Sequence, residues 1–164
     1  MRLLLTSEVH RPVDSGVEIA ASPDSHRPEP WLWDLEIRRQ SRFTSSARTG
    51  SDVTVRVLEG PLLGSGANRH LRLRHHRRDI AAQVDTIDTT GTIRLDRPQH
   101  EIWILVGVTG VVFEGRRRIG PADALILEGE DPSHIELVSA DLANIRIARF
   151  RLRRSDGADL RWVP

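Results

Sequence analysis

Apolar residues recur at every second position along most of the chain, and the stretches that show this alternation are separated by Gly, Pro, Asp or Ser. Because successive side chains of a strand point to opposite faces, a period of two predicts strands with one buried face. No window of 11 residues has the period of an amphipathic helix. The pattern therefore predicts an all-β sandwich or barrel. The clearest runs span residues 31–38, 53–58, 71–75, 92–95, 101–106, 109–113, 124–127, 134–138 and 144–152, and weaker ones span 2–5, 17–21 and 80–87.

The last of these runs does not keep a single apolar phase. Ile145 and Ile147 share one face of the expected strand, whereas Phe150 and Leu152 share the other. A β-bulge or a bend near Ala148 would restore one buried face, because one extra residue shifts the alternation. The sequence therefore predicts an irregular final strand.

Composition narrows the class of protein and its setting. With 164 residues, 38% of them hydrophobic, the chain can bury a core in one domain, 1–164, with halves at roughly 1–80 and 81–164. It has no Cys, which excludes disulfides, thiolate metal sites and cysteine nucleophiles. The N-terminal stretch has three consecutive apolar residues, and no later run approaches a membrane span. These features predict a cytoplasmic protein with no membrane partner.

The balance of charge argues against a nucleic-acid partner. The chain has 24 basic and 23 acidic side chains, so it lacks the broad positive field that non-specific nucleic-acid binding needs. The segment "NRHLRLRHHRRD" is rich in arginine but has no aromatic residues on which bases could stack. We expect it to be a solvated strand face whose arginines meet local acidic partners.

The second half of the chain is similar to the second half of a cupin barrel. The stretch "HEIWILVGVTGVVFEGRRRIGPADALILEGEDPSHIELV" reads as a strand, a tight turn, a strand, and a Pro-containing corner that leads into a further hairpin. The second cupin motif has a Gly, five residues, a Pro, a small-residue turn and a later His. Gly115 and Pro121 match this motif, Ala122-Asp123 replaces its usual Gly-Asp, and His134 follows a turn.

The first half adds a more specific resemblance, to the HutD/Ves family. The family's motifs are matched in order by Glu18-Ile19-Ala20, Trp33-x-Leu35-x-Ile37, Phe43, Gly50-x-Asp52 and Leu58-Glu59-Gly60. The family's W-K-N-G-G-G stretch is absent, and Val17 and Val53 stand where its two characteristic arginines would be. The chain thus resembles a divergent member of that family.

This resemblance implies a fold, a function and a set of site residues. The implied fold is a cupin-like double-stranded β-barrel with two cupin-like halves, a bicupin, in one domain. The implied function is that of a metal-free small-molecule-binding or regulatory protein, linked to amino-acid and particularly histidine metabolism. Its partner would be a small polar or anionic metabolite bound near Glu18, Trp33 and Asp52, with His134 added from the cupin comparison. Residues 38–52 would form a polar loop over the barrel mouth.

The histidines do not form the ligand set of a metal-binding cupin. Such cupins use a His-x-His pair, because imidazoles two residues apart on a strand point the same way, and the sequence has no such pair. Strand alternation places His70 and His76 with Arg72 and Arg74, and His75 on the opposite face. We therefore expect no metal and no cofactor.

Two further functions stay open at this point. The chain could be a cofactorless isomerase, cyclase or hydrolase that uses His134 or His75 as a general acid or base. His134 and Glu136 share a strand face, where an ordinary surface contact is the alternative to catalysis. The chain could also act through a partner surface, and a homodimer is left open. Trp33 and Trp103 lie in matching strands of the two halves, where we expect both to pack in the core.

Overall fold

The chain folds into three antiparallel β-sheets, seen here in a computed structural model. The structure describes residues 2–14, 16–23, 31–39, 53–58, 69–140 and 144–162, of which 39 and 53–58 are described by their backbone. Apart from strands, these residues form one short 3-10 helix, Ser7–Val9. No helix among them is long and apolar enough to cross a membrane.

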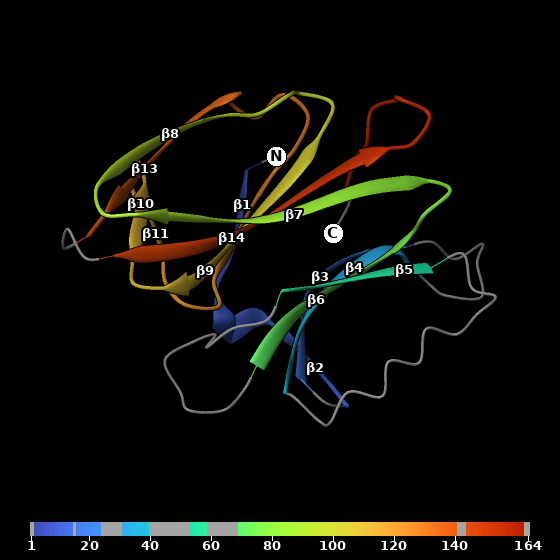
Figure 1. Cartoon of the computed structure of the whole chain (residues 1–164), viewed down its shortest axis with the longest axis horizontal. Coiled ribbons are helices and arrows are strands. Elements are labelled where there is room, and N and C mark those ends of the chain that lie inside the picture. The colour runs from blue at the N-terminus through green and yellow to red at the C-terminus, as the bar shows by residue number, and fades with distance from the viewer. Residues whose placement is uncertain are drawn as a thin grey trace.

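The three sheets lie in layers, with the middle sheet between the other two (Figure 1). The first sheet has the order β2 (Arg11–Val13), β3 (Gly16–Pro23), β4 (Trp31–Arg39), β6 (Arg69–His76) and β5 (Val53–Leu58). The middle sheet has the order β1 (Leu3–Leu5), β12 (Ala124–Leu127), β9 (Ile102–Thr109), β14 (Ile145–Arg154) and β7 (Ile80–Thr89). The third sheet has the order β11 (Arg117–Ile119), β10 (Val112–Glu114), β13 (His134–Ser139) and β8 (Thr92–Asp96).

Two hydrophobic clusters separate the layers. The first cluster joins Trp33, Leu35 and Leu73 of the first sheet to residues of the middle sheet such as Ile104 and Phe150. The second cluster joins the opposite face of the middle sheet to the third sheet. Strand β9 lies between the two clusters and is buried along nearly all its length, as expected for a sheet covered on both faces.

The last strand differs from the prediction made for it. Its odd-numbered residues Ile145 and Ile147 pack in the second cluster, and its even-numbered Phe150 and Leu152 pack in the first. Alternation along β14 is therefore unbroken, and its pairing with β7 is regular from end to end. A register shift does lie close to Ala148, in the pairing with β9 between Arg146 and Ile147. It does not give β14 the single buried face that was expected, because this strand is covered on both faces.

The boundary between the sheets falls close to the middle of the chain. Strands β2 to β6 make the first sheet, and the change to the other two sheets occurs between β6 and β7. Strand β1 is the exception, because Leu3–Leu5 pairs with β12 in the middle sheet. The expected strand over residues 109–113 is divided, since β9 ends at Thr109 and Gly110 has a positive φ of 72°. The other predicted strands are present, within a few residues of their expected ends.

A tight turn before β12 connects the second half to the N-terminus. Pro121 and Ala122 form its corner, and the N–H of Asp123 donates to the carbonyl of Gly120 at 3.1 Å. Asp123 in turn accepts from the backbone N–H of Gly120 at 2.8 Å and from that of Ser7 at 2.9 Å. This carboxylate therefore joins the cupin-type corner to the segment that follows β1.

Candidate functional site

The main polar feature of the first sheet is a set of charged side chains on the face opposite the first hydrophobic cluster. Trp33, Leu35 and Ile37 of β4 point into that cluster, so Asp34 and Glu36 point the other way. The register of β4 with β6 places Asp34 opposite Arg74 and Glu36 opposite Arg72. We call this set the charged ladder: Asp34, Glu36, Arg38, Arg72 and Arg74.

Within the ladder each carboxylate is held by more than one N–H donor. Arg74 donates from Nε to Asp34 Oδ1 at 2.8 Å, and its Nη2 also donates to Asp34 Oδ2. Glu36 Oε2 accepts from Arg38 Nε at 2.7 Å and from Arg72 Nη2 at 2.5 Å. Glu36 Oε1 accepts from Arg74 Nη2 at 3.1 Å, so Arg74 bridges the two acids. Such charge-assisted contacts fix the orientation of the guanidinium planes.

The two acids of the ladder are buried and differ in their proton affinity. Asp34 is 0% exposed and Glu36 is 2% exposed. Burial raises the pKa of Asp34 to about 6, against the opposing effect of Arg74. Burial also acts to raise the pKa of Glu36, but hydrogen bonds from Arg38 and Arg72 outweigh it and lower that pKa to about 2. Neighbouring carboxylates with separated pKa values are a recurrent feature of functional sites.

The ladder also has unused hydrogen-bonding capacity. Arg72 and Arg74 engage the acids through Nε and Nη2, and within the described residues their Nη1 groups have no hydrogen-bond partner. Their side chains are 21% and 28% exposed. Arg74 is further fixed by Trp31, whose ring centre lies 4.7 Å from its Cζ atom. Two oriented guanidinium groups therefore present donors beyond those that the acids use.

Arg97 shows what a purely structural buried arginine looks like in this protein. It is 2% exposed, and its Nη1 and Nη2 donate to backbone carbonyls of residues 98, 99, 101, 129 and 131. Both terminal nitrogens thus donate to loop carbonyls and hold these loops together. Arg72 and Arg74 differ because one terminal nitrogen of each has no partner in the part of the chain that the structure describes.

Glu18 is the predicted site residue that lies beside the ladder. It faces Glu36 across the β3–β4 pairing and accepts from Arg11 Nη2 at 2.7 Å. Trp33 is fully buried on the other face of β4, in the first hydrophobic cluster, as expected for a core residue. Trp103 is also buried, in the second cluster. Asp52 and most of the predicted loop 38–52 lie outside the described residues.

The two histidines considered for catalysis do not join the ladder. His134 lies on β13 of the third sheet, where its exposed side chain contacts Asp96 Oδ1 at 2.7 Å. Glu136 shares that exposed face, as the alternation predicted, and pairs there with Arg94. His75 is buried on the cluster side of β6, opposite Trp33. The structure therefore brings neither His134 nor His75 to the charged face of the first sheet.

The sequence correctly predicted acidic partners for the Arg-rich segment, but not that these partners are buried. Arg72 and Arg74 do pair with acids, on the neighbouring strand. The expected solvated face is found only in part, because Arg72 and Arg74 are partly exposed while their partners Asp34 and Glu36 are buried. The signal was available as two alternating patterns, "WDLE" and "RLR", which place two acids and two arginines on matching strand faces. Among the described residues no three His, Asp or Glu side chains are placed to hold a metal ion.

The layered sheets and their two cupin-like halves define an all-β bicupin fold of the HutD type. A conserved protein of unknown function, PA5104 from Pseudomonas aeruginosa PAO1, matches with a TM-score of 0.73 and 17% identity, over 94% of this chain and 99% of that chain. HutD from Pseudomonas fluorescens SBW25, in a formate condition, matches with a TM-score of 0.66 and 15% identity over the same shares. No family model matches the sequence, and no curated protein does. The resemblance to the HutD/Ves family is thus confirmed at the level of the fold, which does not by itself fix a ligand.

Proposed function

We propose that this protein binds a small polar metabolite that carries an anionic group, at the charged ladder of the first sheet. The observation that carries the proposal is the burial of Asp34 and Glu36 beside Arg72 and Arg74, whose Nη1 groups have no partner among the described residues. Buried ion pairs rarely stabilise a fold more than apolar packing would, so the ladder calls for a role other than stability. Oriented guanidinium groups suit a carboxylate, which can accept two parallel N–H bonds.

In this proposal the residues have separate roles. The Nη1 groups of Arg72 and Arg74 bind the anionic group of the ligand, while Asp34 and Glu36 hold the two guanidinium planes in place. Glu18, beside the ladder, accepts from a polar or cationic part of the ligand. Asp52 stays a predicted contact on the basis of the family resemblance. That resemblance and the fold shared with HutD support a place in amino-acid metabolism, histidine metabolism in particular.

Binding can be tested with a ligand screen and one matched pair of variants. Amino acids, imidazole derivatives, sugars and carboxylates are screened by thermal shift, and hits are measured by calorimetry. Arg72→Gln removes one donor group but leaves Glu36 with Arg38 and Arg74, and we expect it to weaken binding roughly tenfold or more. Arg94→Gln is the control, because it removes the same charge from an exposed pair on the third sheet.

Two outcomes would contradict the proposal. One is a screen in which no compound raises the midpoint of thermal unfolding. The other is a ligand that Arg72→Gln and Arg94→Gln bind equally well, because such a ligand would owe its binding to overall charge and not to the ladder.

A cofactorless enzyme remains the second candidate, with a different residue in the central role. The pKa of Asp34, raised by burial to about 6, suits a group that exchanges a proton near neutral pH. His134 and His75 lie away from the ladder, so Asp34 takes the place of the predicted histidine as general acid or base. Turnover of any ligand found in the screen, lost in Asp34→Asn, would favour this function over binding alone.

A further inference from the structure

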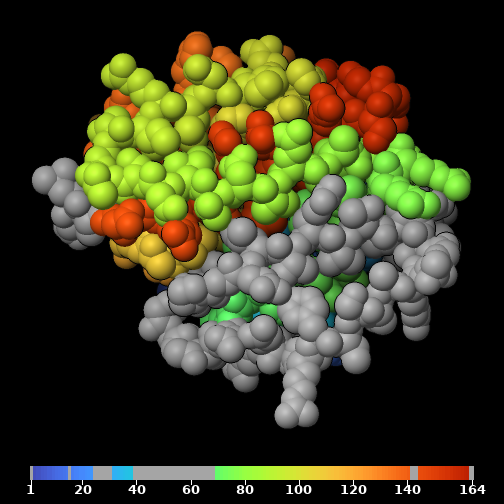
Figure 2. All heavy atoms as spheres, viewed as in Figure 1, coloured from blue at the N-terminus to red at the C-terminus, as the bar shows by residue number. Residues whose placement is uncertain are grey.

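A second set of arginines lies on the middle sheet, far along the chain from the ladder. Arg149, Arg151 and Arg153 occupy alternate positions of β14 and so share one face of that strand. We call these three residues the arginine row. Figure 2 shows orange-red atoms at the surface beside the green atoms of β7, and Arg149 and Arg151 are 19% and 31% exposed.

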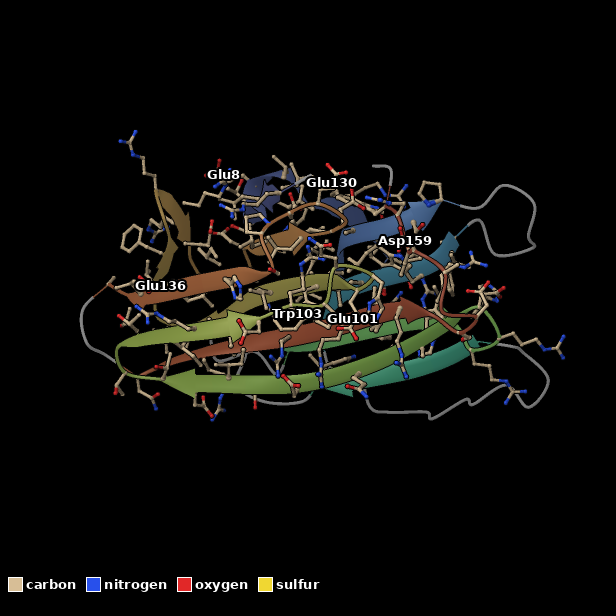
Figure 3. The ribbon with its side chains drawn as sticks, turned by 90° about the horizontal axis from the view of Figure 1, so that it is seen from above. Glu8, Glu101, Trp103, Glu130, Glu136 and Asp159 are labelled. Carbon is tan, nitrogen blue, oxygen red and sulfur yellow. The ribbon has the colours of Figure 1, made fainter. Side chains whose placement is uncertain are left out.

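One carboxylate, that of Asp85 on β7, accepts hydrogen bonds from two arginines of the row. Arg149 donates to it from Nε and from Nη2, each at 2.9 Å, and Arg151 donates from Nη2 at 3.3 Å. Arg153 lies opposite Ala81 and forms no ion pair within the described residues. Glu101, which precedes β9, accepts from Trp103 Nε1 at 2.8 Å, and Figure 3 shows these two side by side.

The arginine row therefore has more N–H donors than the described residues accept. Nη1 of Arg149 and Nη1 of Arg151 have no partner in the described part of the chain, and Arg151 Nε is buried without one. Three neighbouring cations repel one another, and an anion that accepts from the Nη1 groups across the row would lower that repulsion.

Arg149 is held in place in the same way as Arg74 of the ladder. Its Cζ lies 4.8 Å from the centre of the Trp103 ring, and its Nε and Nη2 both donate to the Asp85 carboxylate. Arg74 has the same two supports, Trp31 and Asp34. A guanidinium fixed before binding loses little conformational freedom when a ligand arrives.

From these contacts we infer that the arginine row is a second anion site, distinct from the ladder, and that it takes a small polycarboxylate. Alternate residues of a strand are about 6.6 Å apart, so a single carboxylate reaches at most two neighbouring guanidinium groups. A molecule with two or three carboxylates engages the whole row and gains from each added charge-assisted contact. The site does not depend on the function proposed for the ladder.

Calorimetric titration with citrate tests the inference, with acetate at matched ionic strength as the single-carboxylate comparison. We expect citrate to bind at least tenfold more tightly than acetate. Arg151→Gln and Arg153→Gln each weaken citrate binding by roughly tenfold. Arg146→Gln, which removes a charge from the exposed pair with Asp88 on the other face of the same strand, changes it less than about twofold.

The ladder variant separates this inference from the proposed function. Arg72→Gln leaves citrate binding at the row within about twofold, whether or not the ladder binds a metabolite. The inference is overturned if the parent protein does not bind citrate, if acetate binds as tightly, or if Arg146→Gln weakens citrate binding as much as Arg151→Gln. If Arg72→Gln is the only variant that loses citrate binding, citrate binds at the ladder and not at the arginine row, and the inference is again overturned.

Discussion

At the scale of single residues, Ala122 is the unusual one. It is the non-glycine residue with a positive φ, 69°, in the described part of the chain. Pro121 precedes it, and the Asp123 N–H bonds back to the Gly120 carbonyl, which is the arrangement of a type II turn. This turn favours glycine at the position of Ala122, because a Cβ atom there is strained. The cupin motif has Gly at this position, so the alanine that replaces it here introduces backbone strain.

Replacing this alanine by glycine should therefore stabilise the protein. We expect Ala122→Gly to raise the free energy of unfolding by about 0.5–1 kcal/mol, because relief of strain exceeds the added freedom of the unfolded chain. Urea denaturation followed by circular dichroism measures the change. Gly115→Ala is the reciprocal control, since Gly115 has a φ of 57° and no atom within 4 Å of an added Cβ. It should lower stability, and a gain in that variant would contradict the argument.

At the scale of elements, the pairing of β4 with β6 determines which charged side chains meet on the first sheet. Alternation gives each strand one apolar face and one charged face, and the register brings unlike charges together. Because Asp34 is buried, its charge is costly even beside Arg74, which is why its pKa is raised from 3.8 to about 6. The paired strands therefore make stability depend on pH.

The sign of this dependence follows from proton binding. A carboxyl with a higher pKa in the folded chain binds its proton more tightly there, so the free energy of unfolding falls as pH rises from about 4 to about 6. We expect the parent to lose on the order of 2 kcal/mol relative to Asp34→Asn across this range. Chemical denaturation at a series of pH values measures it. The opposite effect of Glu36 acts at lower pH, between 4.5 and about 2. Parallel profiles for parent and variant would contradict the assignment.

The strands also show which structural features the sequence pattern can predict and which it cannot. Trp33, Leu35 and Ile37 correctly predicted the buried face of β4, because alternation is a local property of a strand. Whether the opposite face meets solvent depends on what packs against it, and for this reason the burial of Asp34 was not predictable. His134 was chosen from the spacing of a cupin motif, which does not determine the sheet in which that strand lies. In β14 the side chains do alternate between the two faces. The prediction failed because it assumed one buried face, whereas both faces of this strand are covered.

At the scale of the whole molecule, the C-terminal segment joins the two halves. Trp162 donates from Nε1 to the carbonyl of Ala21 on β3 at 2.7 Å, and its backbone N–H donates to Glu128 Oε2 at 2.6 Å. Its ring centre lies 6.2 Å from that of Trp33. The segment thus contacts the first sheet on one side and the end of β12 on the other, and both contacts lie at the first hydrophobic cluster.

Removing this ring should weaken the whole fold and not one half of it. We expect Trp162→Ala to lower the free energy of unfolding by roughly 3–5 kcal/mol, as for other buried aromatic residues, with a single transition retained. Denaturation followed by both circular dichroism and tryptophan emission measures this. Asp159→Asn, in the same segment but 68% exposed, is the control and should change little. Two separate transitions in the variant would show that the halves are held together in another way.

The pairing of β1 with β12 has a consequence for the order of events during synthesis. The partner of Leu3–Leu5, Ala124–Leu127, is made more than a hundred residues after it. Until then this apolar tripeptide has no place in the sheet and depends on the growing chain, or on a chaperone, to keep it from associating elsewhere. Closing so long a loop is also slow, so β1 should be among the last strands to dock. Strand β1, made long before β12, would then complete the middle sheet.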